Sequence, residues 1–225
     1  MAANDLSESI LLAALIRAGH DQYLKHARTR VYRRKEFLFA EGDAPDAVYV
    51  IKKGTVRLVK QDPSGRDRVV GIYGPGDVMG ISEIMDMGAY MTSAVARSKV
   101  VATRFPGSVL SEMAKRHTRV ALAMNRELAA HVLELQRNVE YLSVGRAQER
   151  IANLLVRLAS RWHDGTPGKI DLSLTRQEIA DMAGVTVETC IRTMSKFKKN
   201  GLVTMMPRKT ILIDEAALSA VAGAA

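Results

Sequence analysis

Short β-prone runs separated by glycine-containing turns fill residues 31–105, and this pattern constrains the fold more than any other feature of the chain. The turns between the runs contain Gly42, Gly54, Gly65 and Gly76. Many short strands at a spacing of roughly 8–12 residues are typical of an antiparallel roll or barrel rather than of a parallel sheet. We therefore predict an antiparallel β-roll whose strands lie at residues 36–40, 48–51, 55–60, 68–73 and 94–105.

Two other segments have the apolar spacing of helices. Residues 6–26, with apolar positions such as Ile10 and Leu15, predict a short N-terminal helix. Residues 108–144 contain no proline, and within them one series of positions recurs at alternating steps of four and three. The series is Ala121, Asn125, Leu128, Val132, Leu135, Val139 and Leu142.

That spacing is the heptad seam of a coiled coil, and a polar Asn125 on an a-type position fixes the parallel register of two helices. It predicts a long helix through which two copies of the chain dimerise. The alternative is a single amphipathic helix packed on its own β domain. Apolar residues off the seam, Leu122, Met124 and Leu133, indicate that both contacts exist.

The C-terminal part of the chain has the helix caps and turn residues of a helix-turn-helix. Gly145 is a candidate hinge before a helix over residues 146–162, and residues 163–168 read as a loop. Thr175 and Glu178 are then expected to form a capping box, in which the side chain of each residue accepts a hydrogen bond from the backbone N–H of the other.

A second helix follows the first. Gly184 supplies a positive-φ turn, and Thr186 caps a helix that runs to Lys199, with Cys190, Met194 and Phe197 on its apolar side. Residues 201–213 then predict a β-hairpin with its tip at residues 207–209, which makes a winged helix-turn-helix. The expected fold is thus α+β, with a β-roll sensor domain at 1–107, a dimerisation helix and hinge at 108–144, and a winged reader at 145–225.

The second helix carries side chains that suit DNA. Glu188 and Arg192 lie one helical turn apart; Glu accepts a hydrogen bond from cytosine, and Arg makes a bidentate contact to guanine. The alternative is a solvated i,i+4 ion pair. We predict base contacts from Glu188, Arg192, Thr189 and Val187. Phosphate contacts are expected from Thr175, Arg176, Gln177, Thr186, Lys196, Lys199, Arg208 and Lys209.

Composition narrows the function. The net charge of +9 suits a polyanionic partner such as double-stranded DNA. A single cysteine excludes an iron–sulfur cluster held by cysteines alone, and no ligand spacing predicts a metal site. Neither a transmembrane segment nor a signal peptide is recognised, so we expect a cytoplasmic protein without a membrane partner. The sequence contains no recognisable nucleophile–base arrangement, so we do not expect an enzyme.

These motifs together resemble those of the Crp/Fnr family of bacterial transcription regulators. The resemblance covers nearly the whole chain: the turns around Gly42, Gly54 and residues 74–80, the helix around residues 150–159, and the helix-turn-helix from Thr175 to Arg192. It implies a homodimer on a palindromic operator, with Glu188 and Arg192 reading a GA/TC step. The run 187–189 matches the Fnr-type members, which implies an Fnr-like half-site.

The resemblance also bears on the effector. Members that bind cyclic AMP hold its phosphate with Arg and Ser and its ribose with Glu, where this chain has Met91, Thr92 and Ile81. Since an apolar Met91 cannot bind a phosphate, cyclic AMP is disfavoured as the ligand. The expected effector pocket comprises Met79, Ile81, Tyr90, Met91, Thr92, Leu135 and Gln136.

The identity of the effector stays open. The methionines around Tyr90 suit either core packing or an apolar pocket for haem or a hydrophobic small molecule. A cyclic-nucleotide regulator with an atypical pocket, and a ligand-binding module that docks protein partners, are the alternatives. By analogy with relatives, the loop at residues 164–168 is a candidate contact with RNA polymerase.

Overall fold

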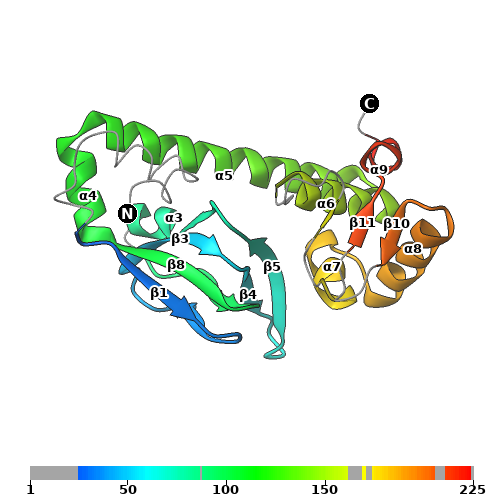
Figure 1. The fold of residues 1–225 in the computed structure, drawn as a ribbon, viewed down its shortest axis with the longest axis horizontal. Helices are drawn as coiled ribbons and strands as arrows, with labels where there is room; N and C mark the ends of the chain where they lie inside the picture. Colours follow the sequence, from blue (N-terminus) through cyan, green and yellow to red (C-terminus); the bar gives the residue numbers. More distant parts are fainter. Residues whose placement is uncertain (1–24, 87, 162–168, 171–173, 206–210, 224–225) are drawn as a thin grey trace. The chain divides into compact units, whose positions relative to one another are not determined.

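The computed structural model describes residues 25–86, 88–161, 169–170, 174–205 and 211–223. The chain divides into two compact units, residues 1–134 and residues 135–225 (Figure 1). The helix expected at residues 6–26 lies almost wholly outside the described residues.

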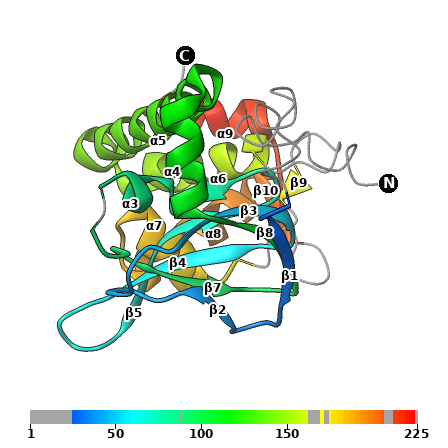
Figure 2. The same ribbon diagram turned by 90° about the vertical axis from the view of Figure 1, so that its left-hand side faces the viewer.

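The first unit is built on two four-stranded antiparallel sheets, which form the two layers seen in Figure 2. One sheet has the order β1 (Arg28–Tyr32), β8 (Val100–Pro106), β3 (Ala47–Lys53) and β6 (Val78–Met79). The other has the order β2 (Phe37–Phe39), β7 (Ser93–Ala96), β4 (Val56–Gln61) and β5 (Asp67–Tyr73). The predicted antiparallel β-roll is therefore confirmed.

The details of the roll differ from the predicted strands. The single strand expected at 94–105 is divided into β7 and β8, because the chain turns at residues 97–99, where the Arg97 N–H donates to the Thr55 carbonyl at 2.9 Å. Strands β1 and β6 and the short helix α3 (Ile81–Asp86) were not predicted. The two residues of β6 and the six of α3 are too few to show a periodicity in the sequence. Strand β1 lacks the alternation of a half-buried strand, because only Tyr32 of its five residues is buried.

Aromatic side chains fill the space between the two sheets. The rings of Phe39 and Tyr90 stack with their centroids 4.0 Å apart, and Tyr49 lies 5.6 Å from Phe39. The Tyr90 hydroxyl donates to the Ala47 carbonyl at 2.8 Å. Burial raises the pKa of Tyr90 above its ordinary range, so this hydroxyl keeps its proton and its hydrogen bond. Tyr90 thus fixes the loop before β7 to the start of β3.

A second core lies on the other face of β3, against helices. Helix α4 (Gly107–Arg116) and the first turns of α5 (Thr118–Val144) bury Leu110, Met113, Val120 and Met124 there. The single helix expected over 108–144 is therefore two helices. They are separated at His117, whose extended backbone (φ −132°, ψ 102°) ends α4.

The second unit has the predicted winged helix-turn-helix. Its helices are α6 (Ala147–Arg161), α7 (Arg176–Ala183), α8 (Val187–Lys199) and α9 (Glu215–Val221). Strands β10 (Val203–Met205) and β11 (Ile211–Ile213) form the hairpin, and β9 (Lys169–Ile170) adds a third strand. Strand β9 and helix α9 were not predicted. The hairpin tip and the whole loop at residues 163–168 lie outside the described residues.

Among the described residues, none of the helices combines the length and the apolar character that crossing a membrane requires.

Gly80 offers a test of this packing. Its φ is +84°, and an added Cβ would lie 2.7 Å from the Ala47 carbonyl oxygen. Gly65 has a similar φ of +77° but nothing within 4 Å of an added Cβ. We expect Gly65→Ala to lower the free energy of unfolding by about 1–2 kcal/mol through backbone strain alone. Gly80→Ala should lose a further roughly 1–3 kcal/mol from overpacking. Urea unfolding measures both, and equal losses would contradict the packing.

Candidate nucleic-acid interface

Helix α7 begins with the predicted capping box. The Thr175 hydroxyl accepts from the Glu178 N–H at 3.1 Å, and the Glu178 carboxylate accepts from the Thr175 N–H at 2.8 Å. Two backbone donors that the helix leaves unpaired are thereby satisfied. Glu178 is buried, so the box also fixes the start of α7 against the rest of the unit.

The turn between α7 and α8 requires glycine. Gly184 adopts a left-handed conformation (φ +61°), and an added Cβ would lie 2.8 Å from Leu142 Cδ2. Thr186 then caps α8, because its hydroxyl accepts from the Thr189 N–H at 3.2 Å. The Thr186 hydroxyl also lies 3.1 Å from the Thr189 hydroxyl, so both side chains are engaged at the start of the helix.

Helix α8 has a buried face and an exposed face. Cys190, Met194 and Phe197 are buried, as predicted. Glu188 and Arg192 are exposed, and within the described part of the chain their side chains form no hydrogen bond or ion pair. The alternative i,i+4 ion pair is therefore not formed, and both side chains are available to an external partner.

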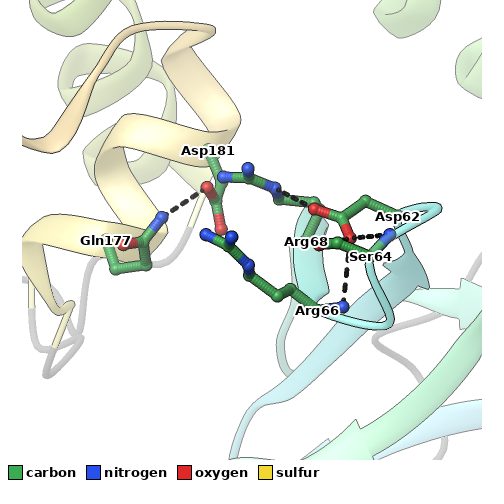
Figure 3. A network of polar contacts seen from close by, with 6 residues as sticks. All are labelled: Asp62, Ser64, Arg66, Arg68, Gln177 and Asp181. Atoms are coloured by element: carbon green, nitrogen blue, oxygen red, sulfur yellow. Dashed lines mark hydrogen bonds and ion pairs between the residues drawn. The ribbon is translucent and has the colours of Figure 1, made fainter.

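The predicted phosphate-contacting residues fall into three groups. Lys196 and Lys199 are exposed on α8. Four are partly or fully engaged within the chain: Gln177 is exposed but donates to Asp181 at 2.8 Å (Figure 3), and Arg176 is half-buried. Thr175 is engaged in the capping box of α7, and Thr186 in the cap of α8. The remaining two, Arg208 and Lys209, lie outside the described residues.

Cys190 is the only cysteine of the chain and lies on the inner face of α8. Burial raises the pKa of its thiol. A protonated, buried thiol is a poor nucleophile, so Cys190 acts as a small apolar residue that packs α8.

The predicted dimer seam is mostly uncovered in a single chain. Leu128 packs against the helical core of the first unit. Asn125 is exposed, and so are the apolar Val132, Leu135, Val139 and Leu142, with Val139 at 63%. Leu122 and Leu133, off the seam, are exposed as well. Such a contiguous apolar series on one helix indicates an interaction face rather than a solvated surface.

Two arginines of α6 join that helix to the last turns of α5, and sequence reasoning missed both. The Arg150 guanidinium donates to the Leu142 carbonyl at 3.2 Å, and Arg157 donates to the Asn138 side chain. A cation near the C-terminal carbonyls of a helix is favourable because it opposes the helix dipole. No local pattern signals these bonds, since each joins residues on either side of the break between α5 and α6 at residues 145–146.

The expected effector residues do not share one environment. Met79, Ile81 and Tyr90 are buried in the cores of the roll. Thr92 is half-buried and Met91 is 67% exposed. Leu135 and Gln136 are exposed on α5.

A cation that sequence reasoning did not consider lies beside Met91. The Lys60 ammonium donates to the Met91 carbonyl at 3.0 Å and forms an ion pair with Glu41 at 2.5 Å. Lys60 is therefore a positive charge close to the position where cyclic-AMP-binding members carry Arg. The ion pair with Glu41 already neutralises the charge of Lys60.

A β-roll followed by a winged helix-turn-helix defines a regulator with a sensor domain and a DNA-binding domain. The cyclic nucleotide-binding domain family matches residues 29–117, and the Crp-like helix-turn-helix domain family matches residues 149–221. The transcriptional activatory protein AadR of Rhodopseudomonas palustris is 30% identical over 211 residues, which cover 92% of this chain and 86% of that relative.

Two further proteins agree with this class. The transcriptional activator protein Anr of Pseudomonas protegens is 29% identical over 198 residues, covering 87% of this chain and 81% of that relative. The solved structure of FixK2 from Bradyrhizobium japonicum has the same fold, with a TM-score of 0.80 at 24% identity over 88% of this chain and 98% of that one. The chain belongs to the Crp/Fnr family of transcription regulators.

Proposed function

We propose that this regulator is a homodimer that reads a palindromic, Fnr-like operator through Glu188 and Arg192. The observation that carries the proposal is the pair of exposed, unpaired side chains on a helix fixed at its start by Thr186. A guanidinium and a carboxylate one turn apart match the major-groove edges of guanine and cytosine. Val187 and Thr189 flank them, while Lys196 and Lys199 supply phosphate contacts.

Dimerisation through α5 follows from its exposed apolar residues. A two-fold dimer presents two identical reading helices, and such helices enter successive major grooves when they lie about 34 Å apart. Asn125 then faces its counterpart and fixes the register of the two helices. The same symmetry requires an operator with inverted half-sites.

The contacts across the hinge suggest how a signal reaches the reader. Leu142 belongs to the seam, its carbonyl accepts from Arg150, and its side chain lies against Gly184. A change in the packing of the seam therefore bears directly on the turn before α8. We infer that an effector acts by shifting α5 and the hinge at residues 143–145.

We propose an effector other than cyclic AMP, with haem or a hydrophobic small molecule favoured. The exposed Met91 offers no charge to a phosphate, and Lys60 beside it is held by Glu41. A cyclic nucleotide would have to displace that carboxylate, which is the specific alternative that Lys60 supports. The absorption spectrum of the purified protein separates these classes, because bound haem gives a Soret band.

The base-reading assignment is tested by Arg192→Ala, with Lys199→Ala as the matched control. Loss of Arg192 removes a base contact worth roughly 1–3 kcal/mol, so the preference for a palindromic over a scrambled duplex should fall by about ten- to one-hundredfold. Lys199→Ala should weaken binding to both duplexes equally and reduce the salt dependence. Fluorescence anisotropy measures both affinities. An Arg192→Ala protein with the original preference would refute the assignment.

The seam is tested by Val132→Asp/Val139→Asp. Placing carboxylates between two helices leaves buried, unpaired charges, so the protein should sediment as a monomer. Ala130→Asp introduces a charge at an exposed position of α5 that is off the seam, and this variant should remain a dimer. If the double variant sedimented as a dimer, α5 would not be the interface.

A further inference from the structure

Helix α8 exposes one large apolar side chain beside the residues that we propose to read bases. Ile191 is 49% exposed. Among the described residues of the second unit, every other exposed large apolar side chain lies on α5, in the proposed dimer seam. The seam therefore accounts for those residues and leaves Ile191 to be explained.

The position of Ile191 on α8 is close to both charged readers. It follows Glu188 by three residues and directly precedes Arg192, and all three side chains are exposed. Residues three apart on a helix are surface neighbours, with their Cβ atoms about 5–6 Å apart. Successive bases of one DNA strand lie about 3.4 Å apart along the axis. When Glu188 contacts a base, Ile191 consequently reaches a base pair one or two steps away.

The hydroxyl groups around Ile191 are engaged within the helix. The Ser195 hydroxyl donates to the Ile191 carbonyl at 2.9 Å. The Thr189 hydroxyl lies 3.1 Å from the hydroxyl of the capping Thr186. Val187, one helical turn before Ile191, is half-buried and adds a second apolar side chain to the same side of α8. This part of the helix thus offers methyl groups to a base rather than hydrogen bonds.

An apolar side chain distinguishes the pyrimidines by one group in the major groove. Thymine carries a C5-methyl group there, whereas cytosine presents an N4 amino donor and no methyl group. Ile191 cannot accept a hydrogen bond from that donor, and covering the donor would remove it from water at a cost. Covering a methyl group is favourable instead, by roughly a fourfold gain in affinity.

We propose that Ile191 contacts the C5-methyl group of a pyrimidine next to the GA/TC step and so selects thymine at that position of each half-site. The contact reads the methyl group and forms no hydrogen bond, so 5-methylcytosine satisfies it as well. The proposal rests on the reading of the GA/TC step by Glu188 and Arg192. It adds to them a residue that determines specificity through apolar contact.

The experiment adds or removes the methyl group alone. Palindromic duplexes hold two inverted GA steps about 10 base pairs apart, with T·A or A·T at the two base pairs on each side of each step. Each of these thymines is replaced in turn, in both half-sites, by uracil, which lacks only the methyl group. A second series carries cytosine or 5-methylcytosine at the position that responds. Fluorescence anisotropy of the full-length protein measures the affinities.

At one position, uracil should weaken binding roughly fourfold for each half-site, or about fifteenfold for both. There, 5-methylcytosine should bind more tightly than cytosine by the same factor. Ile191→Ser should bind the thymine and uracil duplexes equally, with the affinity of the parent for uracil, which also shows that the variant is folded. Ile191→Val should retain the preference for thymine. The control Ser195→Ala, at an exposed position one turn farther along α8, should retain it too.

Equal binding of thymine and uracil by the parent at every position would overturn the proposal, and so would an Ile191→Ser protein that still prefers thymine. Arg192→Ala separates this proposal from the one on which it rests, because it should lose the preference for GA and keep the preference for thymine over uracil. A parent protein without preference for GA over a scrambled step would count against the reading by Glu188 and Arg192 instead.

Discussion

The long helix α5 carries apolar side chains that a single chain leaves exposed to solvent. The first turns of α5 bury Val120 and Met124 in the core of the roll, while farther along the same helix Val132, Leu135 and Val139 are more than half exposed. Burying a side chain of this size contributes roughly 1.5–3 kcal/mol, so leaving several in water is costly unless a partner covers them. A second copy of the helix is the simplest cover, and the heptad spacing of the exposed residues fits it.

The last turns of α5 are also in contact with the helix-turn-helix. The carbonyl of Leu142 is bonded to Arg150 of α6, and the Leu142 side chain lies against Gly184 at the turn before α8. In the proposed dimer, a two-fold axis along α5 would relate two readers, each joined to the last turns of its own α5. Capping at Thr175 and Thr186 fixes the starts of α7 and α8, so that Glu188 and Arg192 project from a defined backbone.

Local rules were enough to predict helices α7 and α8 and the turn between them. The capping box, the left-handed Gly184, the cap at Thr186 and the buried Cys190, Met194 and Phe197 are each set within a few residues, and the structure has all of them. The break at His117, the small strands β6 and β9, and the Arg150 and Arg157 bonds depend on contacts distant in sequence. No local pattern carries that information, which is why they were missed.

The effector residues illustrate the same limit. The family resemblance identified the positions of Met91 and Thr92, but Lys60 reaches the loop at Met91 from β4 and was found only in the structure. The balance of charge beside Met91 is therefore a property of the fold.

Selection of binding sites from random duplexes by the full-length protein tests most directly whether two copies of the chain read an inverted repeat. Two inverted half-sites should be enriched, each with a GA step, with centres about 10 base pairs or one helical turn apart. Enrichment of a single, unpaired half-site, or of no common sequence, would contradict it.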